Sequence, residues 1–170
     1  MAIGYMVNTT INVTPNSDTD DVFLDWVVGQ QKLGEESALV HSISYGGSED
    51  GIPDDNWAKS LDQEFQKFGL TGRSILVSSG DNGAGCGMYG SQLSPEWPTS
   101  SPYVTSVGST TFAIVNGSTV EKSTSWSGSG FSTLYKRPSY QNDVVENYLK
   151  QEGLPPKNMF NQQGRAYPGK

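Results

Sequence analysis

The sequence is poor in the side chains that bind metals or form disulfides. In 170 residues it has one cysteine, Cys86, and one histidine, His41. An internal disulfide needs two cysteines, and a zinc cluster needs about four Cys or His ligands, so both are excluded. We therefore expect no cofactor of this kind. Cys86 is either a buried, inert thiol or a thiol whose partner lies outside this chain.

Basic residues and long apolar runs are also scarce. The chain has 11 Lys and Arg against 18 Asp and Glu, which gives a net charge of -7. Such a surface repels nucleic acid and anionic lipid at neutral pH, so we expect neither as a partner. It suits an acidic compartment, where protonation relieves the repulsion. No apolar run could span a membrane, and the first ten residues, MAIGYMVNTT, lack the pattern of a signal peptide.

Three Asn-x-Ser/Thr sequons are present, at Asn8, Asn12 and Asn116. They are candidate glycosylation sites only if the chain enters the secretory pathway. Triplets of this kind also arise by chance in a chain rich in Ser and Thr.

The first half of the chain alternates strand and helix patterns. The β-branched run TTINV at 9–13 predicts a short strand. Ser17 and Asp18 are suited to cap a helix that begins near Asp20. The apolar face of this helix is predicted to comprise Val22, Phe23, Trp26, Val27 and Leu33. The alternating run at 39–45 predicts the next strand.

A second helix is predicted between Asp54, as its cap, and Gly69, as its end. Its apolar residues, at spacings of four, four and three, are Trp57, Leu61, Phe65 and Phe68. The apolar run at 74–78 then predicts a strand that is covered on both faces. This order predicts the α/β class, a mainly parallel sheet with helices on both faces. Ligands bind such sheets at the carboxyl ends of the strands.

The second half is less regular. Strands are predicted at 104–107 and 110–115, and Asn116-Gly117 is a good hairpin turn that pairs the second strand with residues 119–125. We expect the stretch SGSGFS at 127–132 to be flexible. A helix is predicted at 139–152, where Gly153 ends it. Its inward side chains are predicted to be Val144, Val145, Tyr148 and Leu149.

Few residues have the chemistry of a known active site. His41 lies inside a predicted strand, so a packed core histidine is favoured over a catalytic one. Glu49-Asp50 and Asp54-Asp55 lie on a polar loop and are interpreted as surface or capping groups. No nucleophile elbow, Walker motif or dinucleotide fingerprint is present. The stretch DNGAG offers one carboxylate, which is too few for a calcium loop.

Asp81 is the exception, because it follows a buried strand and sits among glycines in SSGDNGAGC at 78–86. A carboxyl group in a partly dry site has a raised pKa, and once protonated it donates a hydrogen bond. A donor near an acyl carbon stabilises an oxyanion by roughly 3 to 4 kcal/mol. Such a group works only in acid. Asn82-Gly83 is equally typical of a simple turn.

The Asp81 segment is one of several in which the chain resembles the sedolisins, the serine-carboxyl peptidases, and most closely their tripeptidyl-peptidase branch. The resemblance runs along essentially the whole chain and rests on five segments in family order. They are HSISYGGSED (41–50), SSGDNGAGC (78–86), WPTSSPYVTSVGSTTF (97–112), SGSGFSTLYKRPSYQ (127–141) and GRAYP (164–168).

The resemblance implies a subtilisin-like fold and peptide-bond hydrolysis in acid by a Ser nucleophile, a Glu base and an Asp that orients the Glu. By resemblance Asp81 is a second Asp, which lines the oxyanion hole. Ser44, Tyr45 and Gly46 correspond to the strand that binds the substrate backbone. Ser79 and Gly80 would line the pocket for the residue before the cut. The implied partner is a peptide or unfolded protein, and the implied compartment is the lysosome or the exterior.

The family's E-x-x-x-D motif would precede Met1, and its S-G-T-S nucleophile segment and calcium loop would follow Lys170. The family partner of Cys86 would also lie downstream. We therefore expect residues 1–170 to form a single incomplete peptidase domain, truncated at both ends and inactive alone. One apolar sheet face should be bare, which favours self-association. The alternative is a non-catalytic peptide-binding or protein-interaction module that uses the retained cleft.

Overall fold

The computed structural model describes residues 7–13, 21–86 and 92–168. Contacts divide the chain into two compact units, residues 1–37 and 38–170, which are treated separately below. Within the described residues, no helix has the length and apolar character needed to cross a lipid bilayer.

The first unit contains helix α1 (Val22–Leu33), followed by the short 3-10 helix η1 (Gly34–Glu36). The Asp21 carboxylate accepts a hydrogen bond of 2.9 Å from the backbone N–H of Leu24 and so caps α1. The predicted caps Ser17 and Asp18 lie outside the described residues. The strand predicted at 9–13 is wrong, because these residues are exposed and form no regular structure.

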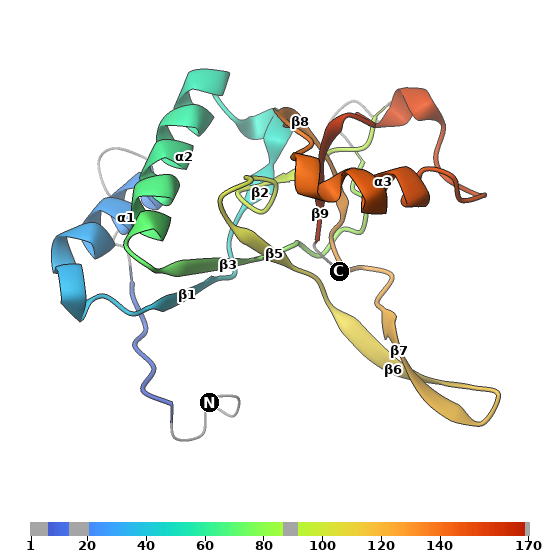
Figure 1. The fold of residues 1–170 in the computed structure, drawn as a ribbon, viewed down its shortest axis with the longest axis horizontal. Helices are drawn as coiled ribbons and strands as arrows, with labels where there is room; N and C mark the ends of the chain where they lie inside the picture. Colours follow the sequence, from blue (N-terminus) through green and yellow to red (C-terminus); the bar gives the residue numbers. More distant parts are fainter. Residues whose placement is uncertain (1–6, 14–20, 87–91, 169–170) are drawn as a thin grey trace. The chain divides into compact units, whose positions relative to one another are not determined.

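The second unit is built on a parallel sheet in the order β1-β3-β5, formed by Val40–Ile43, Ser74–Ser78 and Thr105–Val107 (Figure 1). Helix α2 (Asp55–Leu70) connects β1 to β3 and packs on β3. A parallel pair needs such a crossover, because its strands run in the same direction. The predicted α/β class is confirmed.

Sequence signals at both ends of α2 explain its bounds. The Asp54 carboxylate accepts from the backbone N–H groups of Asn56 (2.7 Å) and Trp57 (2.9 Å), as predicted for the cap. The helix runs one residue past Gly69 and ends at Leu70, and its C-cap Thr71 donates its N–H to the carbonyls of Gly69 and Phe68. Its buried face comprises Ala58, Leu61, Asp62, Phe65 and Phe68.

The two faces of the parallel sheet differ in exposure. Paired residues in a parallel sheet share a face, and one face carries the buried residues His41, Ile75, Val77 and Ser106. On the other face Val40 is 59% exposed and Val107 is 50% exposed. The prediction that β3 is covered on both faces is therefore wrong for this chain, and a bare sheet face is present among the described residues.

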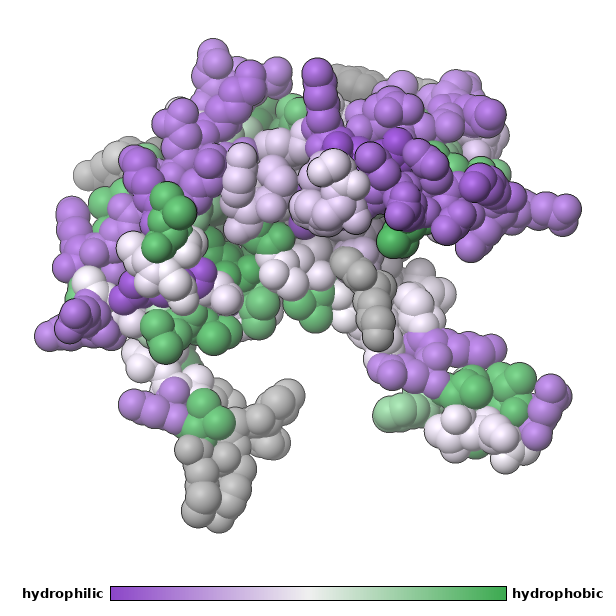
Figure 2. Space-filling view, viewed as in Figure 1, coloured by the Kyte–Doolittle hydropathy of each residue, from purple (hydrophilic) through white to green (hydrophobic). Residues whose placement is uncertain are grey.

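Three antiparallel pairs complete the second unit. Strand β2 (Gly47–Ser48) pairs with β4 (Glu96–Trp97), and β8 (Gly130–Lys136) pairs with β9 (Gly164–Tyr167). Strands β6 (Thr110–Val115) and β7 (Ser118–Ser123) form the predicted hairpin, which extends away from the parallel sheet in Figure 1. Apolar side chains of this hairpin are exposed to solvent (Figure 2), and Phe112 is 75% exposed.

Two expectations for the second half are corrected. The stretch 127–132, expected to be flexible, enters β8 and is fixed by buried side chains, Ser127 and Ser132. The helix predicted at 139–152 is shorter: η3 (Ser139–Gln141) leads into α3 (Asn142–Tyr148). Val145 is buried as predicted, but Val144 is 72% exposed. Val144 and Val145 are adjacent, so their side chains lie about 100° apart around the helix, and in α3 the core covers only Val145 of the two.

Glu49 was interpreted as a surface or capping group, and that interpretation is wrong. Glu49 begins the 3-10 helix η2 (Glu49–Gly51) and is buried. Its carboxylate accepts from the Ser132 hydroxyl (2.6 Å), the Thr133 hydroxyl (2.6 Å) and the Thr133 backbone N–H (2.8 Å). These three donors tie η2 to β8 across 83 residues of sequence. The remaining 3-10 helix is η4 (Lys157–Met159).

Candidate functional site

A cleft of about 880 Å³ opens at the carboxyl ends of β1 and β3. Parallel strands end at the same edge of a sheet, so the segments after β1 and after β3 face one another there. The β2–β4 pair forms a further wall. Residues that line the cleft include Ser44, Tyr45, Gly46, Ser78, Gly80, Asp81, Asn82, Cys86, Glu96 and Trp97.

The segment Ser44–Gly46 continues the chain beyond β1 and is exposed, with Tyr45 64% exposed. In the described structure it lies outside the strand ladders. Gly46 passes so close to β4 that an added Cβ would come within 2.5 Å of the Trp97 carbonyl oxygen. A side chain at residue 46 would therefore push this segment away from the cleft wall.

The loop that carries Asp81 is fixed by backbone hydrogen bonds to residues 126–129. The Gly83 N–H donates to the Trp126 carbonyl (3.0 Å), and the Ser129 N–H donates to the Gly83 carbonyl (2.9 Å). Gly80 accepts from the Gly128 N–H at 2.7 Å. Gly128 must be glycine here, because its Cβ would overlap the Ser79 carbonyl. These hydrogen bonds hold the loop in place, so residues 80–83 are more than a simple turn that reverses the direction of the chain.

Asp81 and Ser44–Gly46 line the same cleft, so the structure brings together the two features that the sequence analysis paired. The surroundings of Asp81 differ from the expectation. The sequence argument assumed a partly dry site, but the Asp81 side chain is exposed to solvent in this chain. The glycines beside it supply backbone without apolar cover, so the described residues do not exclude water from this carboxyl group.

Ser79 and Gly80 are placed differently from one another. Gly80 lines the cleft, whereas Ser79 is buried and is absent from the described lining. The Ser79 hydroxyl lies 3.4 Å from that of Ser127, and its N–H donates to the Val107 carbonyl at 2.9 Å. Any part that Ser79 plays in binding would come from its backbone.

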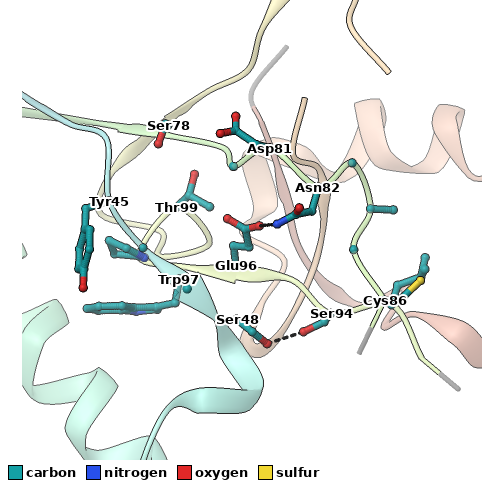
Figure 3. A pocket seen from close by; sticks show the side chains of 18 of the residues that line it. Tyr45, Ser48, Ser78, Asp81, Asn82, Cys86, Ser94, Glu96, Trp97 and Thr99 are labelled. Atoms are coloured by element: carbon teal, nitrogen blue, oxygen red, sulfur yellow. Dashed lines mark hydrogen bonds between the residues drawn. The ribbon is translucent and has the colours of Figure 1, made fainter. Parts of the chain in front are cut away.

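Sequence reasoning missed Glu96, a second carboxylate of the cleft. The Asn82 amide donates to Glu96 Oε1 at 3.4 Å, and Figure 3 shows Asn82 turned toward Glu96 from the Asp81 loop. The backbone N–H of Glu96 donates to the Tyr167 hydroxyl at 2.7 Å. No Lys, Arg or His is among the described residues that line the cleft. Its two carboxylates therefore make the cleft acidic.

A buried polar cluster lies behind the cleft wall and was also missed. The Trp97 indole N–H donates to the Tyr135 hydroxyl at 3.1 Å, and Tyr135 lines a second cavity together with Asp62. Ser101 donates to Asp62, at 2.6 Å. Burial raises the pKa of Asp62, against the hydrogen bond from Ser101 and the charge of Arg165, which lower it. A polar residue on the apolar face of a predicted helix is the signal that could have identified Asp62.

His41 lies away from the cleft, in the core, as favoured from the sequence. Its Nε2 bonds to the Ala38 carbonyl at 2.8 Å, and its ring meets that of Phe68 edge-on at 4.9 Å. Burial lowers the pKa of His41, and this outweighs the hydrogen bond to Ala38. Cys86 is a free, exposed thiol on the cleft, so the buried alternative is wrong.

The three sequon asparagines, Asn8, Asn12 and Asn116, are exposed. Exposure is what glycosylation requires, and their modification stays a prediction. Among the described residues, no group of three or more His, Cys, Asp or Glu could hold a metal ion.

No protein-family model matches the chain. In sequence it is 39% identical over 174 residues to tripeptidyl-peptidase 1 of Bos taurus, and 38% identical to tripeptidyl-peptidase 1 of Rattus norvegicus and of Homo sapiens. Each alignment covers 99% of this chain and 30% of the relative. The chain thus spans about 30% of the length of these curated relatives.

Among solved structures, the chain matches Pseudomonas sedolisin (serine-carboxyl proteinase) complexed with two molecules of pseudo-iodotyrostatin. The TM-score is 0.61 at 25% sequence identity, and the match covers 90% of this chain and 41% of that chain. The parallel sheet with its helices therefore has the α/β fold of that enzyme, and this chain spans less than half of that chain's length.

Proposed function

From the premise that this chain is a tripeptidyl-peptidase-like member of the sedolisin family of serine-carboxyl peptidases, we propose that it carries the substrate-binding and oxyanion part of an acid-acting peptidase. Its substrates would be peptides or unfolded proteins.

One observation carries the proposal: Asp81 and the exposed segment Ser44–Gly46 line a single cleft. An exposed extended segment can pair with a peptide backbone, because such pairing needs only N–H and C=O groups. Gly46 supports this role, since its lack of a side chain lets the segment lie against β4. The acidic cleft would favour peptides that carry positive charge.

Asp81 would act as the oxyanion donor. A protonated carboxyl group at the edge of the cleft can donate to a developing oxyanion, and an ionised one cannot. Because solvent reaches Asp81 in this chain, a bound peptide or further protein would have to supply the dry surroundings. This dependence is a reason to expect weak oxyanion stabilisation from the chain by itself.

We further propose that the chain alone does not hydrolyse peptides. Among the described residues of the cleft, Ser94 is the one serine whose hydroxyl donates to a carboxylate, that of Asp50, at 3.0 Å. Ser94 is buried, Asp50 is exposed to solvent, and no base is hydrogen-bonded to this serine besides that carboxylate among the described residues. Loss of the nucleophile alone costs a related triad about a million-fold in rate.

A peptide-release assay at about pH 4 to 5, near the range in which carboxyl groups titrate, tests the inactivity. We expect no turnover above the buffer blank. Turnover that is lost in Asp81→Ala or Ser94→Ala would contradict the proposal and would identify an unexpected active centre.

Calorimetric titration with short peptides tests binding and separates the proposal from its alternative, a dedicated peptide-binding module. Gly46→Ala should abolish or strongly weaken binding, because its Cβ meets the Trp97 carbonyl. Gly47→Ala is the matched control, since a Cβ there has nothing within 4 Å. Micromolar affinity with no turnover favours the binding module. Millimolar affinity favours an incomplete peptidase site.

The bare face of the parallel sheet supports a second proposal, that the chain associates with itself. Val40 and Val107 lie exposed on that face, and apolar patches of this kind bind partners or aggregate. Sedimentation of the wild-type chain and of Val107→Ser over a range of concentrations tests it. A monomer at all concentrations would contradict the proposal.

A further inference from the structure

Glu49 is a buried carboxylate on the side of the cleft that the segment Ser44–Gly46 forms. It is 5% exposed and directly follows β2, which continues the chain from that segment. Its carboxylate accepts hydrogen bonds of 2.6 Å from the Ser132 and Thr133 hydroxyls and of 2.8 Å from the Thr133 N–H. Its own N–H donates to the Pro95 carbonyl at 2.8 Å. Both its backbone and its side chain are therefore fixed.

The donors to this carboxylate lie in β8, shortly after the residues that hold the Asp81 loop. Just before β8, the Gly128 N–H donates to the Gly80 carbonyl at 2.7 Å, and the Ser129 N–H donates to the Gly83 carbonyl at 2.9 Å. A short stretch of β8 therefore connects the loop on one side of the cleft to the carboxylate on the other side.

Strand β4 connects the same two sides directly. It pairs with β2, its Trp97 carbonyl lies against Gly46, and its Glu96 carboxylate lies beside Gly80. These contacts form a closed ring around the cleft. Its members, in order, are the segment Ser44–Gly46, β2, Glu49, β8, the Asp81 loop and β4.

The Glu49 carboxylate depends on its β8 donors. A buried charge is costly unless it is paired or hydrogen-bonded, and within the described part of the chain Glu49 forms no ion pair. Ser132 is fully buried, and its hydroxyl also accepts from the N–H groups of Leu134 (3.1 Å) and Tyr135 (2.9 Å). Both lone pairs of this hydroxyl are therefore engaged, and its proton is directed to Glu49.

We propose that Glu49 is a positioning residue of the cleft, whose carboxylate, held by β8, fixes the separation between the segment Ser44–Gly46 and the Asp81 loop. A peptide paired with that segment must also reach Asp81, so a preformed separation lowers the cost of binding. The consequence for peptide affinity rests on the function proposed above. The link between the two sides of the cleft does not.

Counting donors and acceptors shows why glutamine cannot replace Glu49. An amide offers one acceptor oxygen and one NH2 group. If the NH2 group faces Thr133, it meets the backbone N–H of that residue, donor against donor. If it faces Ser132, it meets a hydroxyl whose lone pairs already accept from two N–H groups. Either orientation loses hydrogen bonds at a buried site and loosens η2 from β8.

The test is amide hydrogen exchange of the full chain, followed by NMR in the wild type and in Glu49→Gln. We expect the N–H groups of Gly83, Gly128 and Ser129, on the other side of the cleft, to lose protection about tenfold. The N–H of Thr133 bonds to Glu49 directly and should lose protection as well. A loss confined to the amides of β8 would overturn the inference.

Two control variants separate this link from a general loss of stability. Ile75→Ala leaves a cavity near the amino end of β3, at the opposite end of the strand from the cleft. It should lower the protection of the parallel sheet, and that of the three loop-side amides less than Glu49→Gln does. Glu146→Gln removes the same charge from the exposed surface of α3 and should change nothing. Equal profiles for Ile75→Ala and Glu49→Gln would overturn the inference.

Thr133→Val keeps the test decisive if Glu49→Gln does not fold. Valine has the shape of threonine and keeps the backbone N–H, so only one of the three donors to Glu49 is removed. The same three amides, of Gly83, Gly128 and Ser129, should lose protection to a smaller extent. Full protection at all three would contradict the link.

Peptide affinity forms a separate arm, measured by calorimetry with a short peptide that carries one lysine. It should weaken about tenfold in Glu49→Gln and stay unchanged in Ile75→Ala at a temperature at which both variants are folded. An unchanged affinity in Glu49→Gln would refute the consequence for binding. A wild type that binds no peptide would refute the proposed function, whereas the exchange data would still decide whether Glu49 links the two sides of the cleft.

Discussion

The Glu96 carboxylate lies beside Gly80, at the place that a Cβ of residue 80 would occupy, so that this Cβ would overlap its oxygens. Gly80 also has a backbone φ of 97°, a conformation that residues with a side chain rarely adopt. The backbone conformation therefore favours glycine at residue 80, and a side chain there would in addition displace the carboxylate end of Glu96, a cleft residue that the sequence analysis did not single out. The close approach of Glu96 to Gly80 lies at the point where the Asp81 loop leaves β3.

Gly80→Ala should lower the free energy of unfolding by more than the roughly 1 to 2 kcal/mol that a left-handed alanine costs. Chemical denaturation measures this. Gly117→Ala is the matched control, because Gly117 has a φ of 79° with nothing within 4 Å of a Cβ. Adding Glu96→Ala to Gly80→Ala should restore part of the loss, since it removes the overlapping group. Equal losses at residues 80 and 117 would show that Glu96 does not crowd Gly80.

Asp62 should make the chain more stable in acid. Burial raises its pKa in the folded state above the ordinary value of 3.8. A carboxyl group of this kind contributes stability that is fully present below the unfolded pKa and is lost as pH rises through the folded pKa. In Asp62→Asn, the difference in unfolding free energy between about pH 4 and pH 7 should shift toward greater stability at neutral pH. Identical pH profiles for the two proteins would contradict this.

His41 should make the chain less stable in acid, which is opposite to the effect of Asp62. Burial lowers its folded pKa below 6.5, so its contribution to stability is present above the unfolded pKa and is lost as pH falls through 6.5 toward the folded pKa. His41→Gln keeps a donor for the Ala38 carbonyl and removes the titration. Relative to this variant, the wild type should lose stability on acidification from pH 7, as measured by denaturation midpoints. A wild type that gains stability relative to His41→Gln in that window would be evidence against a buried neutral imidazole.

Ser132→Ala should destabilise the second unit by about 2 to 3 kcal/mol, since it removes a hydrogen bond to a charged group. Ser132 donates to Glu49 and also accepts from the N–H groups of Leu134 (3.1 Å) and Tyr135 (2.9 Å). The exposed Ser118→Ala should change stability by less than about 0.5 kcal/mol. Thermal or chemical unfolding measures both, and a loss at Ser132 as small as that at Ser118 would mean that Glu49 is satisfied without it.

Local signals predicted the regular elements well where the deciding residue is adjacent in sequence. Asp54 capped α2, and Asn116-Gly117 formed the hairpin turn, with φ values of 50° and 79°. The carboxyl ends of β1 and β3 followed from the strand order alone. These features depend on contacts within a few residues or on the topology of a parallel pair, and both can be read from a pattern.

Predictions were wrong or incomplete where partners far apart in sequence decide the outcome. Glu49 is buried because Ser132 and Thr133 supply donors from 83 and 84 residues away. Glu96 reaches the cleft because β4 pairs with β2, and neither two-residue strand has a pattern of its own. Asp81 was expected in dry surroundings, but the residues that would cover it cannot be inferred from the glycines beside it.

The most direct test of the account maps where a short peptide binds, by NMR titration of the isotopically labelled chain at about pH 5, where exposed carboxylates begin to titrate. The account predicts that amide shifts concentrate at Ser44–Gly46 and on the loop from Gly80 to Gly83, and that the peptide stays intact throughout. Shifts confined to other surfaces, or an unperturbed spectrum at millimolar peptide, would contradict it.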